Sequence, residues 1–138
     1  MIREIGLFAG IAFLGAAPLL WQSAPAPKDA ASSVPADVAA QTNPVHPTAA
    51  GLAQAKKMYG WDCAMCHGKD GGGDGDMASQ LKAKVKDYRD PAALKGMTDG
   101  ELFYIIQKGK GEMPSEGDRA KAEEIWNMVS LVRSFSKK

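Results

Sequence analysis

The chain has 138 residues, of which 17 are basic and 16 acidic, so its formal net charge is +1. This length fits one small domain with an extra segment and gives no sign of a large enzyme. The near-neutral balance excludes bulk charge as the basis for binding nucleic acid or an anionic membrane surface. The two cysteines, Cys63 and Cys66, are too close in sequence to staple distant parts of a fold, so they must do chemistry or hold a group.

The first 21 residues form an apolar leader. A single Arg3 precedes a nearly unbroken apolar run of seventeen residues, from Ile5 to Trp21. That length is at the lower edge of what spans a bilayer, and proline directly follows the small-residue pairs that a signal peptidase would need. The sequence leaves open whether residues 1–21 are a cleaved signal peptide or a retained membrane anchor. Either way, we expect the rest of the chain on the periplasmic side of the cytoplasmic membrane.

A change of composition separates the leader from the domain. Residues 22–47 are rich in Ala, Pro and Ser and contain few large apolar side chains. Such a segment buries too little apolar surface to order itself, so it predicts a flexible linker. Residues 48–138 are then predicted to form one small domain, whose meagre core a large prosthetic group would help to stabilise.

The first half of this domain predicts a helix followed by a glycine-rich loop. Thr48 is a suitable N-cap for a helix over residues 49–62, which carries Leu52 and Ala55 at helical spacing. Five glycines then lie between residues 68 and 75 and favour an irregular, wrapping loop. Residues 78–83 are expected to form a short helical turn.

The second half predicts two further helices. Thr98 and Glu101 form a capping box for a helix that Gly109 can terminate. Asp118 is expected to cap a closing helix. The apolar stripe of that helix consists of Ala122, Ile125, Trp126, Val129 and Val132. Because no alternating strand pattern occurs, the domain is predicted to be all-α.

The stretch "WDCAMCHG" supports three kinds of chemistry. A redox-active thiol pair needs a βαβ setting and a thiolate at a helix start, whereas these cysteines follow a predicted helix in a chain without strands. A structural zinc site needs four ligands, and beyond Cys63, Cys66 and His67 the chain offers only His46, in the linker. In a c-type haem, two cysteines at this spacing reach both vinyl groups of one porphyrin, and the following histidine meets the iron. The spacing favours covalent haem.

A methionine ligand for the opposite face of the iron is the second expected feature. Met113 comes 46 positions after His67, directly before Pro114 and just past the predicted helix, so its segment is restricted. The competing ligands are Met77, Met97 and, in the linker, His46. Other methionines are expected to fill the core or to lie too close to the motif.

Residues 49–135 resemble a bacterial mono-haem class I cytochrome c. The resemblance rests on "CHGKDGGGDG" and "GELFYIIQKGKGEMP" and covers almost the whole domain. It implies a small fold wrapped around one covalently bound haem c, with an iron bound by His67 and Met113 and thioether bonds to Cys63 and Cys66.

The chain departs from the family at two places. Ala55 stands where the first helix usually has glycine and Leu131 where the last helix often has an aromatic residue, so we expect Trp126 to supply the aromatic bulk. The proline whose carbonyl usually accepts the second N–H of the ligand histidine does not occur in residues 68–90. The acceptor for His67 is therefore open.

Two strong iron ligands leave no position for a substrate, so the sequence predicts an electron carrier and not an enzyme. We expect it to carry one electron between respiratory or dehydrogenase partners. Two alternatives remain open: a fixed haem subunit of a larger oxidoreductase, and a haem sensor or peroxidase whose Met113 is displaceable. A docking rim for an acidic partner is another expectation, and its lysines are Lys82, Lys84, Lys86, Lys108 and Lys110.

Overall fold

The computed structural model describes residues 34–137, so the predicted leader and the start of the predicted linker lie outside the described residues. The helices are α1 (Ala36–Ala39), α2 (Ala49–Met58), α3 (Ala64–His67), α4 (Asp99–Lys108) and α5 (Ala122–Ser134). Within residues 34–137 no β-strand occurs, which confirms the predicted all-α class. In that same part of the chain, no helix combines the length and the apolar character needed to cross a membrane.

The first predicted helix is one continuous helical rod, residues 49–67, made of α2, a π-helical turn and α3. Thr48 caps α2 as expected, because its Oγ1 accepts a hydrogen bond from the N–H of Gly51 (3.0 Å). Instead of continuing as an α-helix to residue 62, the chain widens into a π-helical turn, Tyr59–Cys63, and then tightens again into α3. Such turns are frequent at functional sites.

Both ends of α4 agree with the sequence. The N–H of Glu101 donates to Thr98 Oγ1 (3.1 Å), and the Glu101 carboxylate accepts from the N–H of Thr98 (2.7 Å), so the capping box is confirmed. Gly109, at φ 77°, ends the helix as predicted.

The start of α5 corrects the prediction that Asp118 caps this helix. The helix begins at Ala122, and the N–H of Lys121 donates to the Glu124 carboxylate (2.8 Å). Asp118 lies in the preceding turn, where the carbonyl of Glu116 accepts from residues 119 and 120 and holds the chain out of the helix. Ala122 is exposed, so it does not belong to the buried stripe.

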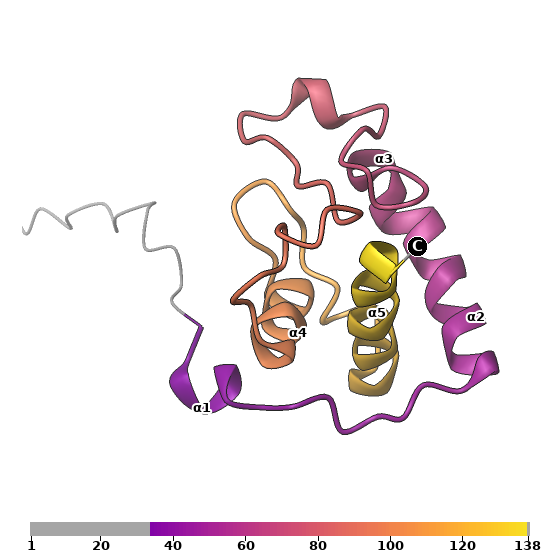
Figure 1. Ribbon diagram of the computed structural model, residues 1–138, viewed down its shortest axis with the longest axis vertical. Coiled ribbons are helices and arrows are strands. Elements are labelled where there is room, and N and C mark those ends of the chain that lie inside the picture. The colour runs from indigo at the N-terminus through magenta and orange to yellow at the C-terminus, as the bar shows by residue number, and fades with distance from the viewer. Residues whose placement is uncertain (1–33, 138) are drawn as a thin grey trace, which may run out of the picture.

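α5 lies between α2 and α4 and provides the centre of the core (Figure 1). Its Ile125 and Val129 are fully buried. Ala55 of α2 is 1% exposed, consistent with a close crossing of α2 over α5. Trp126, which was expected to supply aromatic bulk at that crossing, stacks on Phe103 of α4 with ring centroids 4.2 Å apart.

Residues 34–47 run along one end of the domain, although composition predicts a linker up to residue 47 (Figure 1). α1 packs on α4, and the N–H of Gly100 donates to the carbonyl of Gln41 (3.1 Å). The side-chain amide of Asn43 donates to the carbonyl of Trp126 in α5 (2.9 Å). Polar bonds to helix backbone therefore order a segment that has few large apolar side chains.

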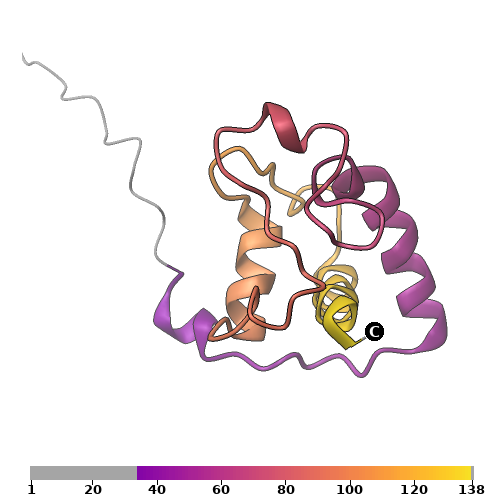
Figure 2. The same cartoon turned by 45° about the horizontal axis from the view of Figure 1, so that its top comes forward.

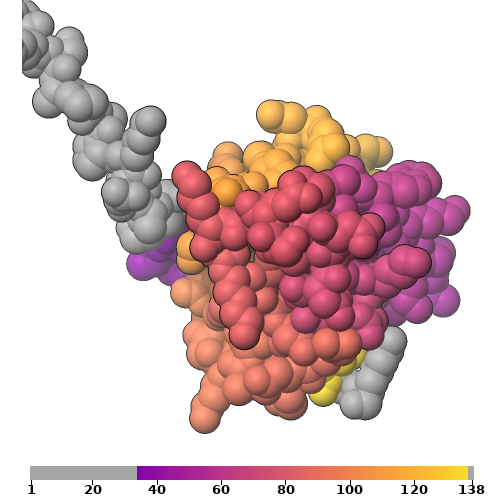
Figure 3. Space-filling view, turned by 90° about the horizontal axis from the view of Figure 1, so that it is seen from above, coloured from indigo at the N-terminus to yellow at the C-terminus, as the bar shows by residue number. Residues whose placement is uncertain are grey.

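The cysteine motif and the long loops gather at the other end of the molecule (Figures 1 and 2). Figure 3 views that end directly and shows the loop after α3 spread over much of the face. The short 3₁₀ turn Ala78–Gln80 lies in this loop, where residues 78–83 were expected to form a helical turn. The fold thus brings the motif and the loops together on one face.

Candidate functional site

The helical rod presents both cysteines from the same face. Cys63 ends the π-helical turn, and Cys66 lies in α3 directly before His67. All three side chains are half-buried. Residues three apart on a helix point to the same side, so the two thiols can reach one group.

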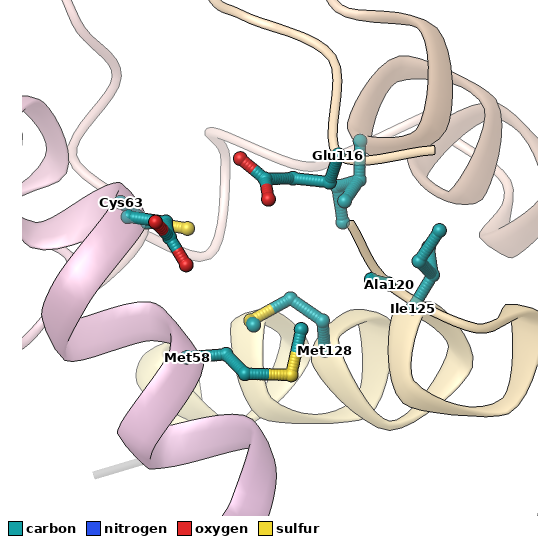
Figure 4. A pocket seen from close by; sticks show the side chains of 8 residues that line it. Met58, Cys63, Glu116, Ala120, Ile125 and Met128 are labelled. Atoms are coloured by element: carbon teal, nitrogen blue, oxygen red, sulfur yellow. The ribbon is translucent and has the colours of Figure 1, made fainter. Parts of the chain in front are cut away.

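A small pocket opens beside Cys63 (Figure 4). It is lined by Met58, Asp62, Cys63, Ile106, Glu116, Ala120, Ile125 and Met128. Most of these side chains are apolar, and the Glu116 carboxylate extends into the space towards Cys63. As far as the described residues define this lining, Cys66, His67 and Met113 do not belong to it.

The surroundings of Cys63 oppose thiolate chemistry. Burial, followed by the nearby carboxylates of Glu116 and Asp62, raises the pKa of the Cys63 thiol to about 12. A redox-active pair needs a thiol whose pKa is lowered. Within residues 34–137, no group of three or more side chains of the His, Cys, Asp and Glu types is arranged to hold a metal ion.

His67 is held by packing. Its ring stacks on that of Tyr88, with centroids 5.2 Å apart and 20° between the planes. Burial lowers the pKa of His67, which favours the neutral imidazole that binds metals. In the part of the chain that the structure describes, the buried Nδ1 atom has no hydrogen-bond partner, so no protein acceptor takes the place of the missing proline carbonyl.

The glycine-rich loop folds back onto the motif. Tyr59 donates its buried hydroxyl to the carbonyl of Gly68 (2.9 Å), and the N–H of Gly73 donates to the carbonyl of His67 (2.8 Å). Gly73 has φ 72°, and an added Cβ would lie 2.8 Å from the carbonyl oxygen of Val85. This position therefore requires glycine.

Met113 sits in a tight turn braced by α4. Lys110 and Met113 exchange backbone hydrogen bonds of 3.1 and 3.0 Å, and the Met113 side chain packs against the core. An added Cβ at Gly109 would lie 2.5 Å from the carbonyl oxygen of Met113, so the chain can pass this close only as glycine. After the turn, the N–H of Glu116 donates to the carbonyl of Ile106 (3.0 Å) in the last turn of α4.

Similar proteins agree with this geometry. A family model described as cytochrome c oxidase, cbb3-type, subunit III, matches residues 50–132. The chain is 32% identical over 112 residues to a chloroplastic cytochrome c6 of Chlamydomonas reinhardtii, covering 78% of this chain and 70% of the relative. It is 33% identical over 93 residues to a cytochrome c6 of a Synechococcus strain, covering 65% and 75%. The chain belongs to the class I cytochrome c family.

Solved structures also match this cytochrome. The reducing HAO-like protein complex of Kuenenia stuttgartiensis contains a chain that superposes with a TM-score of 0.60 at 26% identity, covering 67% of this chain. The present chain spans 46% of that longer chain. The c-type cytochrome KustC0563 gives a TM-score of 0.52 at 28% identity, covering 59% of this chain and 95% of its own.

As a class I cytochrome c, the protein transfers electrons and carries one covalently bound haem c with its iron. This confirms the family, the cofactor and the carrier activity expected from the sequence. The described residues fit such a group. Two thiols on one helix face, an imidazole that burial keeps neutral and a thioether on a stiff turn are the kinds of donor that such a group takes. The pocket at Cys63 is mostly apolar, as a porphyrin edge requires.

The competing ligands lie in less suitable places. Met77 is 38% exposed, and the Sδ of Met97 accepts a hydrogen bond from the Lys86 ammonium (3.7 Å). His46 is exposed on the segment at the opposite end of the domain. Sequence reasoning missed Glu116, which is only 5% exposed, because a glutamate in a loop is expected in solvent. The signal in the sequence was Arg119, three positions after Glu116, which can pair with a buried carboxylate.

Proposed function

We propose that Cys63 and Cys66 would hold the haem of this cytochrome by thioether bonds, and that His67 and Met113 would be the ligands of its iron. The turn at Met113, held by paired backbone bonds and by α4, is the observation that carries the proposal. A thioether ligand must be positioned by a segment that stays in place when the iron changes charge.

The haem supplies one-electron redox chemistry when it is bound. The protein's own residues keep both ligands in place and exclude other ligands. Tyr88 restricts rotation of the His67 ring by stacking, and the apolar side chains Met58 and Ile106 keep water from the Cys63 side. Methionine ligation favours the reduced iron, which suits a carrier on the oxidising side of a respiratory chain.

The protein works between redox partners outside the cytoplasm, attached to the membrane if residues 1–21 remain as an anchor. Covalent haem is attached to chains after their export from the cytoplasm, and residues 1–21 are an apolar leader. Both points support this location. All five lysines of the expected docking rim are exposed, which supports docking to an acidic partner. Those lysines are Lys82, Lys84, Lys86, Lys108 and Lys110.

A second candidate is a haem subunit fixed in a larger oxidoreductase. The name of the matched family, a subunit of a cbb3-type oxidase, favours it. Purification of the full chain from its native membrane, with a haem stain of each fraction, separates the two. Co-elution with other subunits supports the fixed subunit, and elution alone supports the free carrier.

The ligand set is tested with haem-loaded protein made by a strain that attaches haem to exported chains. We expect Met113→Ala to keep covalent haem but to lose the spectrum of methionine ligation and to lower the reduction potential. Met97→Ala is the matched control and should change little. The reverse result would reassign the ligand, and rapid binding of carbon monoxide to the reduced wild type would favour the sensor or peroxidase.

A further inference from the structure

Three charged side chains connect the Met113 side of the site to the cysteine-bearing helix. We call residues 67–75 with Tyr88 the His67 side, and residues 109–120 the Met113 side. Arg119 donates from Nη1 to Asp62 Oδ1 (3.1 Å) and from Nη2 to Glu116 Oε1 (2.6 Å). One guanidinium therefore joins the residue directly before Cys63 to a residue three positions after Met113.

Both carboxylates of the bridge lie at the pocket, whereas the Arg119 side chain reaches solvent. The side chain of Glu116 is 7% exposed and that of Asp62 27%, and both residues line the pocket together with Cys63 (Figure 4). The backbone of Glu116 is fixed in turn, because its N–H donates to Ile106 and its carbonyl accepts from Arg119 and from Ala120. Because the Glu116 backbone is fixed, the bonds of Arg119 restrain the Met113 side relative to Asp62 on the cysteine-bearing helix.

We propose that Arg119 is a positioning residue that keeps the Met113 side closed on the cysteine-bearing helix and thereby keeps the Met113 thioether on the iron. This rests on the proposed ligand set. A thioether is a weaker ligand than a nitrogen base, so an outside base such as imidazole replaces it whenever its segment opens. The apparent affinity for imidazole then reports the fraction of molecules that are open.

Arg89 offers a matched control on the His67 side. It pairs with Asp87 (2.9 Å), Asp70 (3.3 Å) and Asp74 (3.9 Å), and its side chain is 44% exposed, against 55% for Arg119. Arg119 pairs with two carboxylates and Arg89 with three, at comparable exposure. If losing a surface ion pair were the cause, Arg89→Ala and Arg119→Ala would change the imidazole affinity alike. If Arg119 positions the Met113 side, only Arg119→Ala changes it.

The experiment is an imidazole titration of the oxidised, haem-loaded protein, followed by the absorption band of the methionine–iron bond. We expect Arg119→Ala to raise the apparent affinity for imidazole roughly three- to tenfold, and Arg89→Ala to leave it as in the wild type. Arg119→Lys should give an imidazole affinity between those of the wild type and Arg119→Ala, because lysine keeps the charge but cannot bond both carboxylates in the same geometry. If Arg119→Ala yields no folded protein, Asp62→Asn cuts the bridge at its more exposed end and should raise the affinity in the same direction.

Equal affinities in Arg119→Ala, Arg89→Ala and the wild type would overturn the proposal, as would equal rises in both variants. Failure of the ligand set itself looks different. In that case the wild type lacks the methionine–iron band, or Met113→Ala binds imidazole no more tightly than the wild type does.

Discussion

The two sides of the site are held in different ways. On the His67 side, the backbone bonds of the glycine loop return to the motif, as the bond from Gly73 to the carbonyl of His67 shows (2.8 Å). On the Met113 side, the bonds lead to the end of α4, at Ile106 and Gln107. The His67 side is therefore fixed to the cysteine motif itself, and the Met113 side to the end of α4, the helix directly before it. We expect the Met113 side to open first, while the haem stays attached.

The largest effect is expected from Gly109→Ala. The new Cβ would meet the carbonyl oxygen of Met113 (2.5 Å) at φ 77°, and the other near atoms, in Pro114 and Ser115, are also backbone, which leaves little room to adjust. We expect a loss of about 2–4 kcal/mol in the free energy of unfolding from strain and crowding together. Methionine ligation should be lost at a lower urea concentration than the helical signal, which absorption and circular dichroism can follow in one titration.

Gly73→Ala is the matched change on the His67 side. Its φ is 72°, and the new Cβ would lie 2.8 Å from Val85 O, a slightly longer contact than at Gly109. We expect a loss of about 2–3 kcal/mol. Because this loop is tied to the motif, methionine ligation and helical structure should be lost together. Early loss of the methionine band in this variant would contradict the proposed difference between the two sides.

Tyr88→Ala tests the packing on His67. Tyr88 is half-buried and stacks on the His67 ring, so we expect a loss of about 1–3 kcal/mol, less than for a fully buried aromatic residue. Covalent haem should remain, and the paramagnetic shifts of the haem methyl groups in proton NMR should report a turned imidazole. Tyr88→Phe keeps the ring and should keep the wild-type spectrum. If Tyr88→Phe matches Tyr88→Ala, the hydroxyl and not the stack orients His67.

The sequence predicted those features that depend on local chemistry. Caps at Thr48 and Thr98 and the stop at Gly109 need only neighbouring residues, and all three were predicted correctly. The cap at Asp118 was wrong, because Glu116 holds the following turn for its own bonds. That competition becomes visible only once α4 has packed.

Long-range contacts escaped prediction for the same reason. Asn43 orders residues 34–47 through a bond to Trp126, 83 positions away, which composition cannot reveal. Tyr59 packs on Phe135, with ring centroids 5.1 Å apart, a contact that spacing along the chain does not reveal. The motif could be interpreted from spacing, whereas Arg119 and Glu116 required the fold.

The smallest effect is expected from Tyr59→Phe, which removes one bond between the helical rod and the His67 side. Loss of the buried bond to Gly68 (2.9 Å) should reduce the free energy of unfolding by about 0.5–1.5 kcal/mol near neutral pH. Methionine ligation should persist up to the unfolding transition, because the Met113 side is untouched. Tyr104→Phe, on α4, serves as the control at neutral pH.

The same variant has a distinct alkaline behaviour. Burial raises the pKa of Tyr59 above its ordinary value of 10.0, so the folded protein holds the phenol proton more tightly than the unfolded chain does. The contribution of Tyr59 is therefore complete below about pH 10 and declines as the pH rises further, because the unfolded chain ionises first. We expect the wild type to lose its advantage over Tyr59→Phe above about pH 10, as measured by urea midpoints across the alkaline range. A constant difference between the two midpoints at all pH values would show that Tyr59 does not hold its proton in the fold, and the contact between the rod and the His67 side would then be looser than the hydrogen bond indicates.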